Sequence, residues 1–435
     1  MTEAYLQHVW HRHKIGAEAF VTSDDRKLEL ITPGILNRDA GPDFLHAKLR
    51  IDGLLMAGHV EVHIRSSDWF RHGHQKDKLY NAVILHVVYE TDTVAVRSDG
   101  SPIPEIALRG HLDEMPFWRY EQWLQEKNWI PCATEAQRWD HSKMRIWLER
   151  LAFNKLESRW KEIEKLMIKG KSFRQCAWEL TSRSFGMRVN ADAFQELARR
   201  VDWKKVVFCM EKEDEVLEGL LFGASGLLNQ DLHEDYPCQL RELWLRWSER
   251  LGIKPMSIEN WRFARLRPHN FPTIRLAQLC AFIRRAHPSL PFERTSELLK
   301  ARPHSYWQNH YRFGKTSNRS IDPEPGNTFL LQFKINAEIP LHFAASRRTG
   351  RAGDEYLQFL AEFPPEDNRI SRGFSALGFR SECALDSQGL LELKSRYCDK
   401  NACWTCSIGQ DLLTSYFEDK VHSRVEIDRK DEVRH

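Results

Sequence analysis

The stretch that decides the fold is residues 41–64, which read GPDFLHAKLRIDGLLMAGHVEVHI. From Val60 to Ile64, apolar and polar residues alternate strictly, so a β-strand would place Glu61 and His63 side by side on one face. Six of the chain's 19 histidines lie between residues 41 and 86. This density of proton-transfer and metal-binding groups predicts a hydrolytic site.

A second strand, Phe44 to Ile51, precedes this one, and Asp52-Gly53 is a turn signal that would join the two as a hairpin. In such a hairpin, Asp43 approaches Glu61 across the strand pair. Two close carboxylates repel when both are ionised, unless a divalent cation lies between them. The alternative is the solvated, charged face of an ordinary sheet edge.

The segment after the hairpin is predicted to be a helix followed by a buried strand. Residues 66–68 offer N-cap groups, and His74 and Asp77 would share a helix face because they are three positions apart. Val83 to Tyr89 is an apolar run typical of a buried strand, and it contains His86. The predicted order is therefore strand, turn, strand, helix, strand.

This order, with Pro42-Asp43 before one strand and Glu61-Val62-His63 on the next, resembles the PD-(D/E)xK nuclease superfamily. The resemblance implies an α+β fold with a mixed sheet, and a Mg²⁺ (or Mn²⁺) ion held by Asp43 and Glu61. His63 stands where the superfamily has lysine, and it would orient the attacking water or stabilise charge. Glu3 would be the acid on the first helix. Further side chains could bind phosphate or transfer protons: His72, His74 and Asp77.

A wider set of short motifs runs along the chain: Gly41-Pro42-Asp43-Phe44, Gly58-His59-Val60-Glu61-Val62-His63, Ser67-Asp68-Trp69, His72-Gly73-His74-Gln75-Lys76-Asp77, Val83-Ile84-Leu85-His86-Val87-Val88, Arg267-Pro268-His269-Asn270-Phe271-Pro272 and Tyr397-Cys398. With these motifs the chain resembles, over nearly its full length, a bacterial family named only as domain of unknown function 2851. That family name implies no activity, so the nuclease expectation rests on the shorter motif.

The composition is that of a globular protein. The chain has 435 residues, of which 42% are hydrophobic and 29% charged, and its net charge of +3 does not suggest a protein that coats nucleic acid. We expect no membrane partner, because there is no apolar N-terminal signal and no run of roughly 20 apolar residues. Nine cysteines with scattered spacing do not form a secreted disulfide framework, which favours a cytoplasmic location.

Three regions follow from the distribution of patterns. Residues 1–130 would be the nuclease-like domain, 131–310 a helical domain and 311–435 a C-terminal helical region with a cysteine cluster.

Two further groups of residues suggest binding sites. Arg265, Arg267 and Arg275 flank two prolines in a loop that could hold backbone phosphates, although these arginines could instead pair with nearby acids. Cys398, Cys403 and Cys406 have spacing that suits Zn²⁺ or an iron–sulfur cluster, with Cys383 as an available fourth ligand. The alternative is that these thiols serve as small apolar residues.

The sequence thus favours a metal-dependent nuclease or phosphodiesterase acting on nucleic acid. Two alternatives remain: a zinc hydrolase that uses the histidine cluster, and a non-catalytic nucleic-acid or protein-binding module on a decayed nuclease fold.

Overall fold

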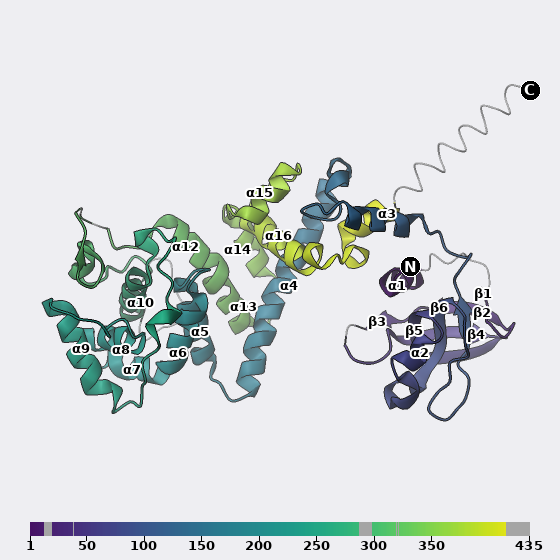
Figure 1. Cartoon of the computed structure of the whole chain (residues 1–435), viewed down its shortest axis with the longest axis horizontal. Helices are drawn as coiled ribbons and strands as arrows, with labels where there is room; N and C mark the ends of the chain where they lie inside the picture. Colours follow the sequence, from purple (N-terminus) through teal and green to yellow (C-terminus); the bar gives the residue numbers. More distant parts are fainter. Residues whose placement is uncertain (13–19, 38, 287–297, 319, 321, 415–435) are drawn as a thin grey trace, which may run out of the picture. The chain divides into compact units, whose positions relative to one another are not determined.

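The N-terminal strands form one mixed β-sheet in the computed structural model of the chain (Figure 1). The structure describes residues 1–12, 20–37, 39–286, 298–318, 320 and 322–414. The strands of the sheet are β1 (Phe20–Val21), β2 (Lys27–Thr32), β3 (Ile35–Leu36), β4 (Phe44–Ile51), β5 (Leu54–Arg65), β6 (Val83–Glu90) and β7 (Glu105–Ala107). Neighbours follow the order β1-β2-β4-β5-β6-β7, and β3 also pairs with β4. β4 and β5 are antiparallel, whereas β5-β6 and β6-β7 are parallel.

The predicted hairpin is confirmed. Asp52 and Gly53 both have positive φ, 48° and 82°, as a two-residue turn with the twist of a hairpin requires. The register pairs Phe44 with Val60, so Asp43 lies beside Glu61 at the start of β4.

The prediction that a single helix carries both His74 and Asp77 is wrong. The chain forms a short helix α2 (Asp68–Arg71) and then two 3₁₀ turns, η1 (His74–Lys76) and η2 (Lys78–Ala82). Gly73 ends α2 with φ of 79°, a left-handed conformation that a helix cannot contain. His74 and Asp77 therefore do not share a helix face.

The sheet belongs to a unit that also contains the end of the described chain. This sheet unit comprises Met1–Trp147, Ala376–Gly378 and the described part of Leu393–His435. Its remaining elements are α1 (Glu3–His11), α3 (Met115–Gln125), η3 (Ala133–Arg138), η8 (Cys398–Lys400) and η9 (Cys403–Thr405). The Tyr120 hydroxyl donates to the Asn401 carbonyl at 2.8 Å, and the Tyr5 ring lies 4.7 Å from the Trp404 ring. These contacts hold the C-terminal segment against the first helices.

The helical unit comprises Leu148–Ser375 and Phe379–Glu392. It contains most of α4 (His141–Ile168) and of α16 (Ala384–Arg396). The other helices are α5 (Phe173–Phe185), α6 (Ala191–Arg200), α7 (Trp203–Met210), α8 (Asp214–Ala224), α9 (Asp235–Ser248), η4 (Ile258–Asn260), η5 (Pro268–Asn270), α10 (Pro272–Ala286), η6 (Ser305–Gln308), α12 (Asn327–Phe333), η7 (Lys334–Glu338), α13 (Ile339–Arg348), α14 (Glu355–Glu362) and α15 (Arg369–Ala376). A small hairpin joins β8 (His310–Arg312) to β9 (Lys315–Thr316). The predicted α+β class, with a sheet followed by a mainly helical region, is confirmed.

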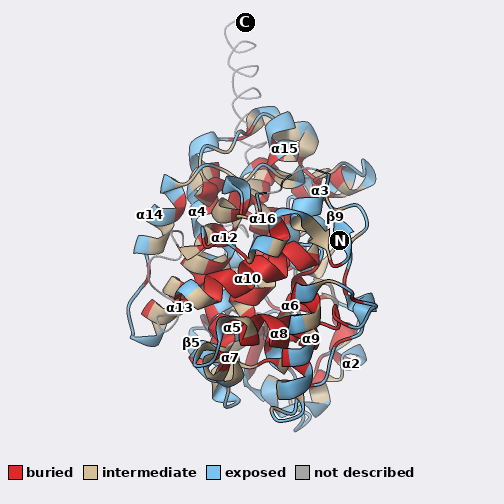
Figure 2. Ribbon diagram, turned by 90° about the vertical axis from the view of Figure 1, so that its left-hand side faces the viewer, coloured by how far each residue is buried: buried red, intermediate tan, exposed pale blue. Residues whose placement is uncertain are grey.

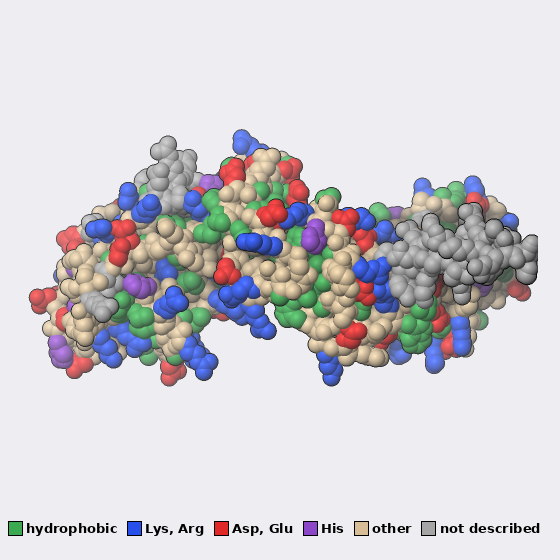
Figure 3. All heavy atoms as spheres, turned by 90° about the horizontal axis from the view of Figure 1, so that it is seen from above, with side chains coloured by type: hydrophobic (Ala, Val, Ile, Leu, Met, Phe, Trp, Pro, Cys, Tyr) green, Lys and Arg blue, Asp and Glu red, His purple; other side chains and the backbone are tan. Residues whose placement is uncertain are grey.

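Helix α10 runs through the core of the helical unit, and Figure 2 shows it buried. It packs against α8 and α5, so its apolar residues face neighbours on all sides. Within the described residues, no helix has both the length and the apolar character needed to span a membrane. On the face shown in Figure 3, Lys and Arg side chains lie among Asp and Glu side chains.

Candidate metal centre in the sheet unit

Asp43 and Glu61 converge as the hairpin predicts. The Asp43 backbone N–H donates to Glu61 Oε2 at 3.0 Å, and the Val62 N–H donates to Asp43 Oδ2 at 3.1 Å. Burial, followed by the neighbouring charge of Glu61, raises the pKa of Asp43 to about 7. The two carboxyl groups are therefore locked together by the backbone at the end of the hairpin.

Glu61 and His63 occupy one face of β5, and that face is buried. Glu61 is 5% exposed and His63 is 1% exposed, so the alternative of a solvated sheet edge is wrong. Glu61 Oε1 lies 3.6 Å from His63 Nε2 and 3.3 Å from His74 Nε2. His74 Nε2 is buried and makes no hydrogen bond within the described chain. A buried polar atom of this kind usually has a partner, so its position 3.3 Å from Glu61 needs an explanation.

His72 completes a histidine trio with His63 and His74. One ring nitrogen from each of the three lies within 4.8 Å of the other two, and His63 Nε2 is 3.1 Å from His72 Nδ1. A tetrahedral zinc ion, with Zn–N bonds of about 2.0–2.1 Å, holds neighbouring donors roughly 3.3 Å apart. Three separations are close to this value: His63 to His72, Glu61 to His74 and Glu61 to His63. The donor set fits a metal that accepts imidazole, such as Zn²⁺, better than Mg²⁺, which prefers oxygen.

A buried chain of close polar contacts orients His63. His63 Nδ1 is 2.8 Å from His86 Nε2, and His86 Nδ1 is 2.9 Å from Glu105 Oε2. Because a carboxylate only accepts, the His86 tautomer that suits Glu105 has its proton on Nδ1, and its Nε2 then accepts from His63. His63 then carries its proton on Nδ1, which leaves the Nε2 lone pair directed toward the trio. Burial and the neighbouring His86 lower the pKa of His63 to about 2, so the ring is neutral.

Helix α1 adds two side chains to this site. Gln7 hydrogen-bonds the Asp43 carboxyl group, and Glu3, one turn earlier, interacts electrostatically with Asp43 and His72. Burial raises the pKa of Glu3, and the neighbouring His72 opposes that shift. The acid expected on the first helix therefore does lie beside the predicted site.

Comparison with known proteins places the chain in a family. Residues 3–369 match the family described as "Protein of unknown function (DUF2851)". The chain belongs to this family. No curated protein and no solved structure matches it, and none of these comparisons links it to PD-(D/E)xK nucleases.

Three residues of the DUF2851 site are hard to recognise in the sequence. Glu105 opens the edge strand β7, where the register pairs it with His86. Gln7 is four positions after Glu3 on α1, a helical spacing that could have indicated a shared face. Tyr80 stacks on His74 with 3.8 Å between the ring centroids, and burial raises the pKa of its hydroxyl to about 12.

Asp77 lies at the edge of this arrangement. Its exposed carboxylate accepts from the Leu79 N–H at 2.9 Å and so caps η2. The DUF2851 chain therefore uses Asp77 to end one 3₁₀ turn and start the next.

The three predicted arginines lie in the helical unit and have different environments. Arg265 and Arg267 are exposed. Arg275 is 5% exposed and donates to Asn270 Oδ1 at 2.6 Å and Gln278 Oε1 at 2.7 Å. The hydrogen-bond acceptors of Arg275 are side-chain amides, whereas the alternative given in the sequence analysis was that these arginines pair with nearby acids.

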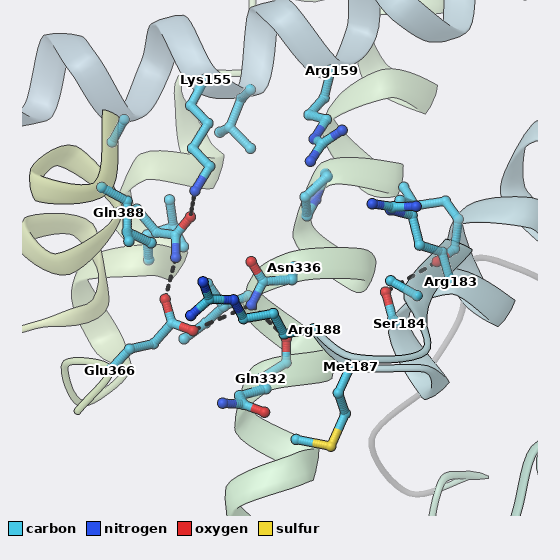
Figure 4. A pocket seen from close by; sticks show the side chains of 18 residues that line it. Lys155, Arg159, Arg183, Ser184, Met187, Arg188, Gln332, Asn336, Glu366 and Gln388 are labelled. Carbon is cyan, nitrogen blue, oxygen red and sulfur yellow. Dashed lines mark hydrogen bonds between the residues drawn. The ribbon is translucent and has the colours of Figure 1, made fainter. Parts of the chain in front are cut away.

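The helical unit also contains a pocket of about 460 Å³ (Figure 4). Cations line it together with apolar residues, and Glu366 accepts hydrogen bonds from Gln388 and Asn336. The cations are Lys155, Arg159, Arg183 and Arg188. Two of these cations are paired with acids outside the lining, Arg159 with Glu162 and Arg183 with Asp192, so the positive charge of the pocket is partly neutralised. Arg265, Arg267 and Arg275 are not among its lining residues.

Proposed function

We propose that the sheet unit is the centre of a metal-dependent phosphodiesterase, with nucleic acid as its substrate class. The observation that carries this proposal is the histidine trio, whose three ring nitrogens lie within 4.8 Å of one another, with Glu61 Oε1 3.3 Å from His74 and 3.6 Å from His63. The nearly buried site and the hydrogen-bonded support of His63 are features of metal sites that do chemistry.

The proposed metal differs from the Mg²⁺ expected from the carboxylates alone. Three imidazoles and one carboxylate favour Zn²⁺, and Mn²⁺ is the second candidate because it accepts both oxygen and nitrogen. When bound, such an ion polarises a phosphoryl oxygen and lowers the pKa of coordinated water. His63, His72, His74 and Glu61 would hold it. The sequence analysis treated a phosphodiesterase and a zinc hydrolase that uses the histidine cluster as separate functions. The present proposal combines them, because the histidines would hold the metal of the phosphodiesterase.

The chain's own side chains supply the remaining functions. Asp43 can hold or release a proton near neutral pH beside Glu61, as a general acid or base must. His72 is exposed, so it can contact a ligand that approaches from solvent. Arg71 is 68% exposed, pairs with Asp68 at 2.8 Å and interacts electrostatically with His63 and Glu3, so a phosphate could contact its guanidinium.

The nucleic-acid assignment rests on the order of the motifs. The structure has the predicted order of strand, turn, strand, helix and strand, with Pro42-Asp43 before β4 and Glu61-Val62-His63 on β5, and it pairs β6 in parallel with β5. Convergence of Asp43 and Glu61 supports a catalytic site over a non-catalytic binding module, for which separated carboxylates would have been the sign. Arg265 and Arg267 remain proposed contacts for the phosphate backbone.

The test is hydrolysis by metal-stripped protein that is reloaded with Zn²⁺, Mn²⁺ or Mg²⁺ separately. Single-stranded DNA, double-stranded DNA, RNA and a small phosphodiester are the probes. We expect cleavage with Zn²⁺ or Mn²⁺ and none in the presence of EDTA. His72→Ala should abolish metal binding and cleavage, and it should preserve the fold because the side chain is exposed.

His111→Ala is the matched control, since His111 is an exposed histidine of the same unit outside the trio. It should retain metal and activity. Because Glu61 is buried, Glu61→Gln must be accompanied by a melting curve that separates loss of activity from loss of fold. Full cleavage in EDTA, or a His72→Ala variant as active as wild type, would overturn the proposal.

A further inference from the structure

The C-terminal cysteines lie on a compact loop. This cysteine loop, residues 398–406, consists of η8 and η9, joined through Asn401 in a left-handed conformation with φ of 53°. The Ala402 N–H donates to the Tyr397 carbonyl at 2.9 Å, and the Cys406 N–H donates to the Cys403 carbonyl at 3.2 Å. These bonds fold the loop tightly, and Cys403 and Cys406 are buried.

A fourth thiol reaches the same place from a distant part of the sequence. Cys132 lies just before η3, and all six pairs among Cys132, Cys398, Cys403 and Cys406 are close enough to interact electrostatically. Cys132, Cys403 and Cys406 are 8%, 5% and 6% exposed. Cys383, the fourth ligand considered from the sequence, belongs to the helical unit instead.

Burial raises the pKa of all four thiols, so their deprotonation would need a bound metal ion. Cys406 accepts backbone hydrogen bonds from Ile408 and Gly409, which would stabilise a thiolate at that sulfur. Lys394, 9% exposed, lies near Cys398 and is also paired with Asp399.

We propose that Cys132, Cys398, Cys403 and Cys406 bind an iron–sulfur cluster that fixes the C-terminal segment to the sheet unit. Within the described chain, three ligand atoms lie within 4.8 Å of one another at the histidine trio and not among these thiols. A single tetrahedral zinc ion would need sulfurs only about 3.8 Å apart, given Zn–S bonds of about 2.3 Å. A cluster of two or four irons spreads its thiolates over several metal atoms, so it suits the wider spacing.

The experiment uses the full chain, purified without oxygen and without added metal. We expect iron and acid-labile sulfide in equal amounts, with the broad visible absorption of sulfide-to-iron charge transfer. Cys132→Ser should lower the iron content about fivefold or more, because four ligands are needed for a closed site. Cys383→Ser is the matched control and should keep wild-type iron, sulfide and absorption.

Cys132→His covers the case in which Cys132→Ser fails to fold, because imidazole can replace thiolate on iron and shifts the reduction potential upward. It should retain iron with a changed visible spectrum and a higher potential. Less than roughly a tenth of an equivalent of iron in the wild-type protein would overturn the proposal. So would stoichiometric zinc without sulfide, or loss of the cluster in Cys383→Ser and not in Cys132→Ser. None of these outcomes depends on hydrolase activity.

Discussion

Glu105→Gln tests whether the buried chain behind His63 supports the metal centre. Glu105 Oε2 faces His86 Nδ1 at 2.9 Å, and Oε1 accepts from the Ser66 and Thr91 hydroxyls at 2.8 and 2.7 Å. Glutamine has the same shape, and its one oxygen can still accept from His86. Its NH₂ group then faces two hydroxyls, which can turn and accept. The substitution therefore removes the charge without opening a cavity.

The magnitude follows from replacing the charged partner of His86 by a neutral one. Hydrogen bonds to charged groups contribute about 1.5–3 kcal/mol, and neutral ones about 0.5–1.5 kcal/mol, so the expected loss is about 1–1.5 kcal/mol. If His63 is a ligand, that energy appears as weaker metal binding, since about 1.4 kcal/mol corresponds to tenfold in affinity. We expect the Zn²⁺ dissociation constant to rise about tenfold, within the range found for groups that orient metal ligands.

The assay is competition for Zn²⁺ against a chromophoric chelator, with a melting curve of the metal-free protein. Glu90→Gln is the matched control, because Glu90 ends the same strand as His86 but pairs with Arg109 at the surface. It should leave the dissociation constant unchanged. Equal Zn²⁺ affinity in Glu105→Gln and wild type would refute the argument that Glu105 acts on the metal through the two imidazoles.

Four other substitutions have distinct expected effects. Arg267→Ala should weaken nucleic-acid binding and lower its salt-dependence slope by roughly 1, whereas Arg275→Ala should lower the melting temperature, because buried hydrogen-bond acceptors lose their donor. Burial alone would raise the pKa of Glu179, but hydrogen bonds from Lys171 and other donors lower it, so the ionised carboxylate stabilises the fold above its unfolded-state pKa. Glu179→Gln should therefore reduce the stability to urea at pH 7. The difference from wild type should vanish as the pH falls through the lowered pKa. Tyr120→Phe should cost about 1 kcal/mol in urea unfolding by removing its bond to the cysteine loop. Unchanged binding by Arg267→Ala, or a Glu179→Gln effect that does not depend on pH, would contradict these expectations.

The local part of the site was predictable because short-range rules determine it. Strand alternation placed Glu61 beside His63, and the Asp52-Gly53 turn brought Asp43 to Glu61. His86 was correctly expected in a buried strand next to the site.

The rest depended on interactions that spacing does not encode. Gly73 ended α2 early, so His74 turned toward Glu61 while Asp77 became a cap. Glu105 lies in the site because β6 and β7 pair in parallel with His86 opposite Glu105. That pairing is a non-local contact, which a local sequence pattern does not indicate. Cys132 and Cys398 are separated by hundreds of residues, and no local pattern indicates that they meet.

The return of the C-terminal segment to the sheet unit has a consequence for how the protein is made. The two long segments of the sheet unit end at Trp147 and resume at Leu393, and nearly all of the chain between them belongs to the helical unit. The ribosome therefore makes these two segments of the sheet unit at different times. At about 5–20 residues per second, a ribosome needs roughly 12–50 s to cross this interval of about 250 residues. During that time Tyr5 and Tyr120 have no partners from the cysteine loop. The helical unit can fold during this interval. The sheet unit therefore begins to emerge from the ribosome first, but its synthesis is completed last.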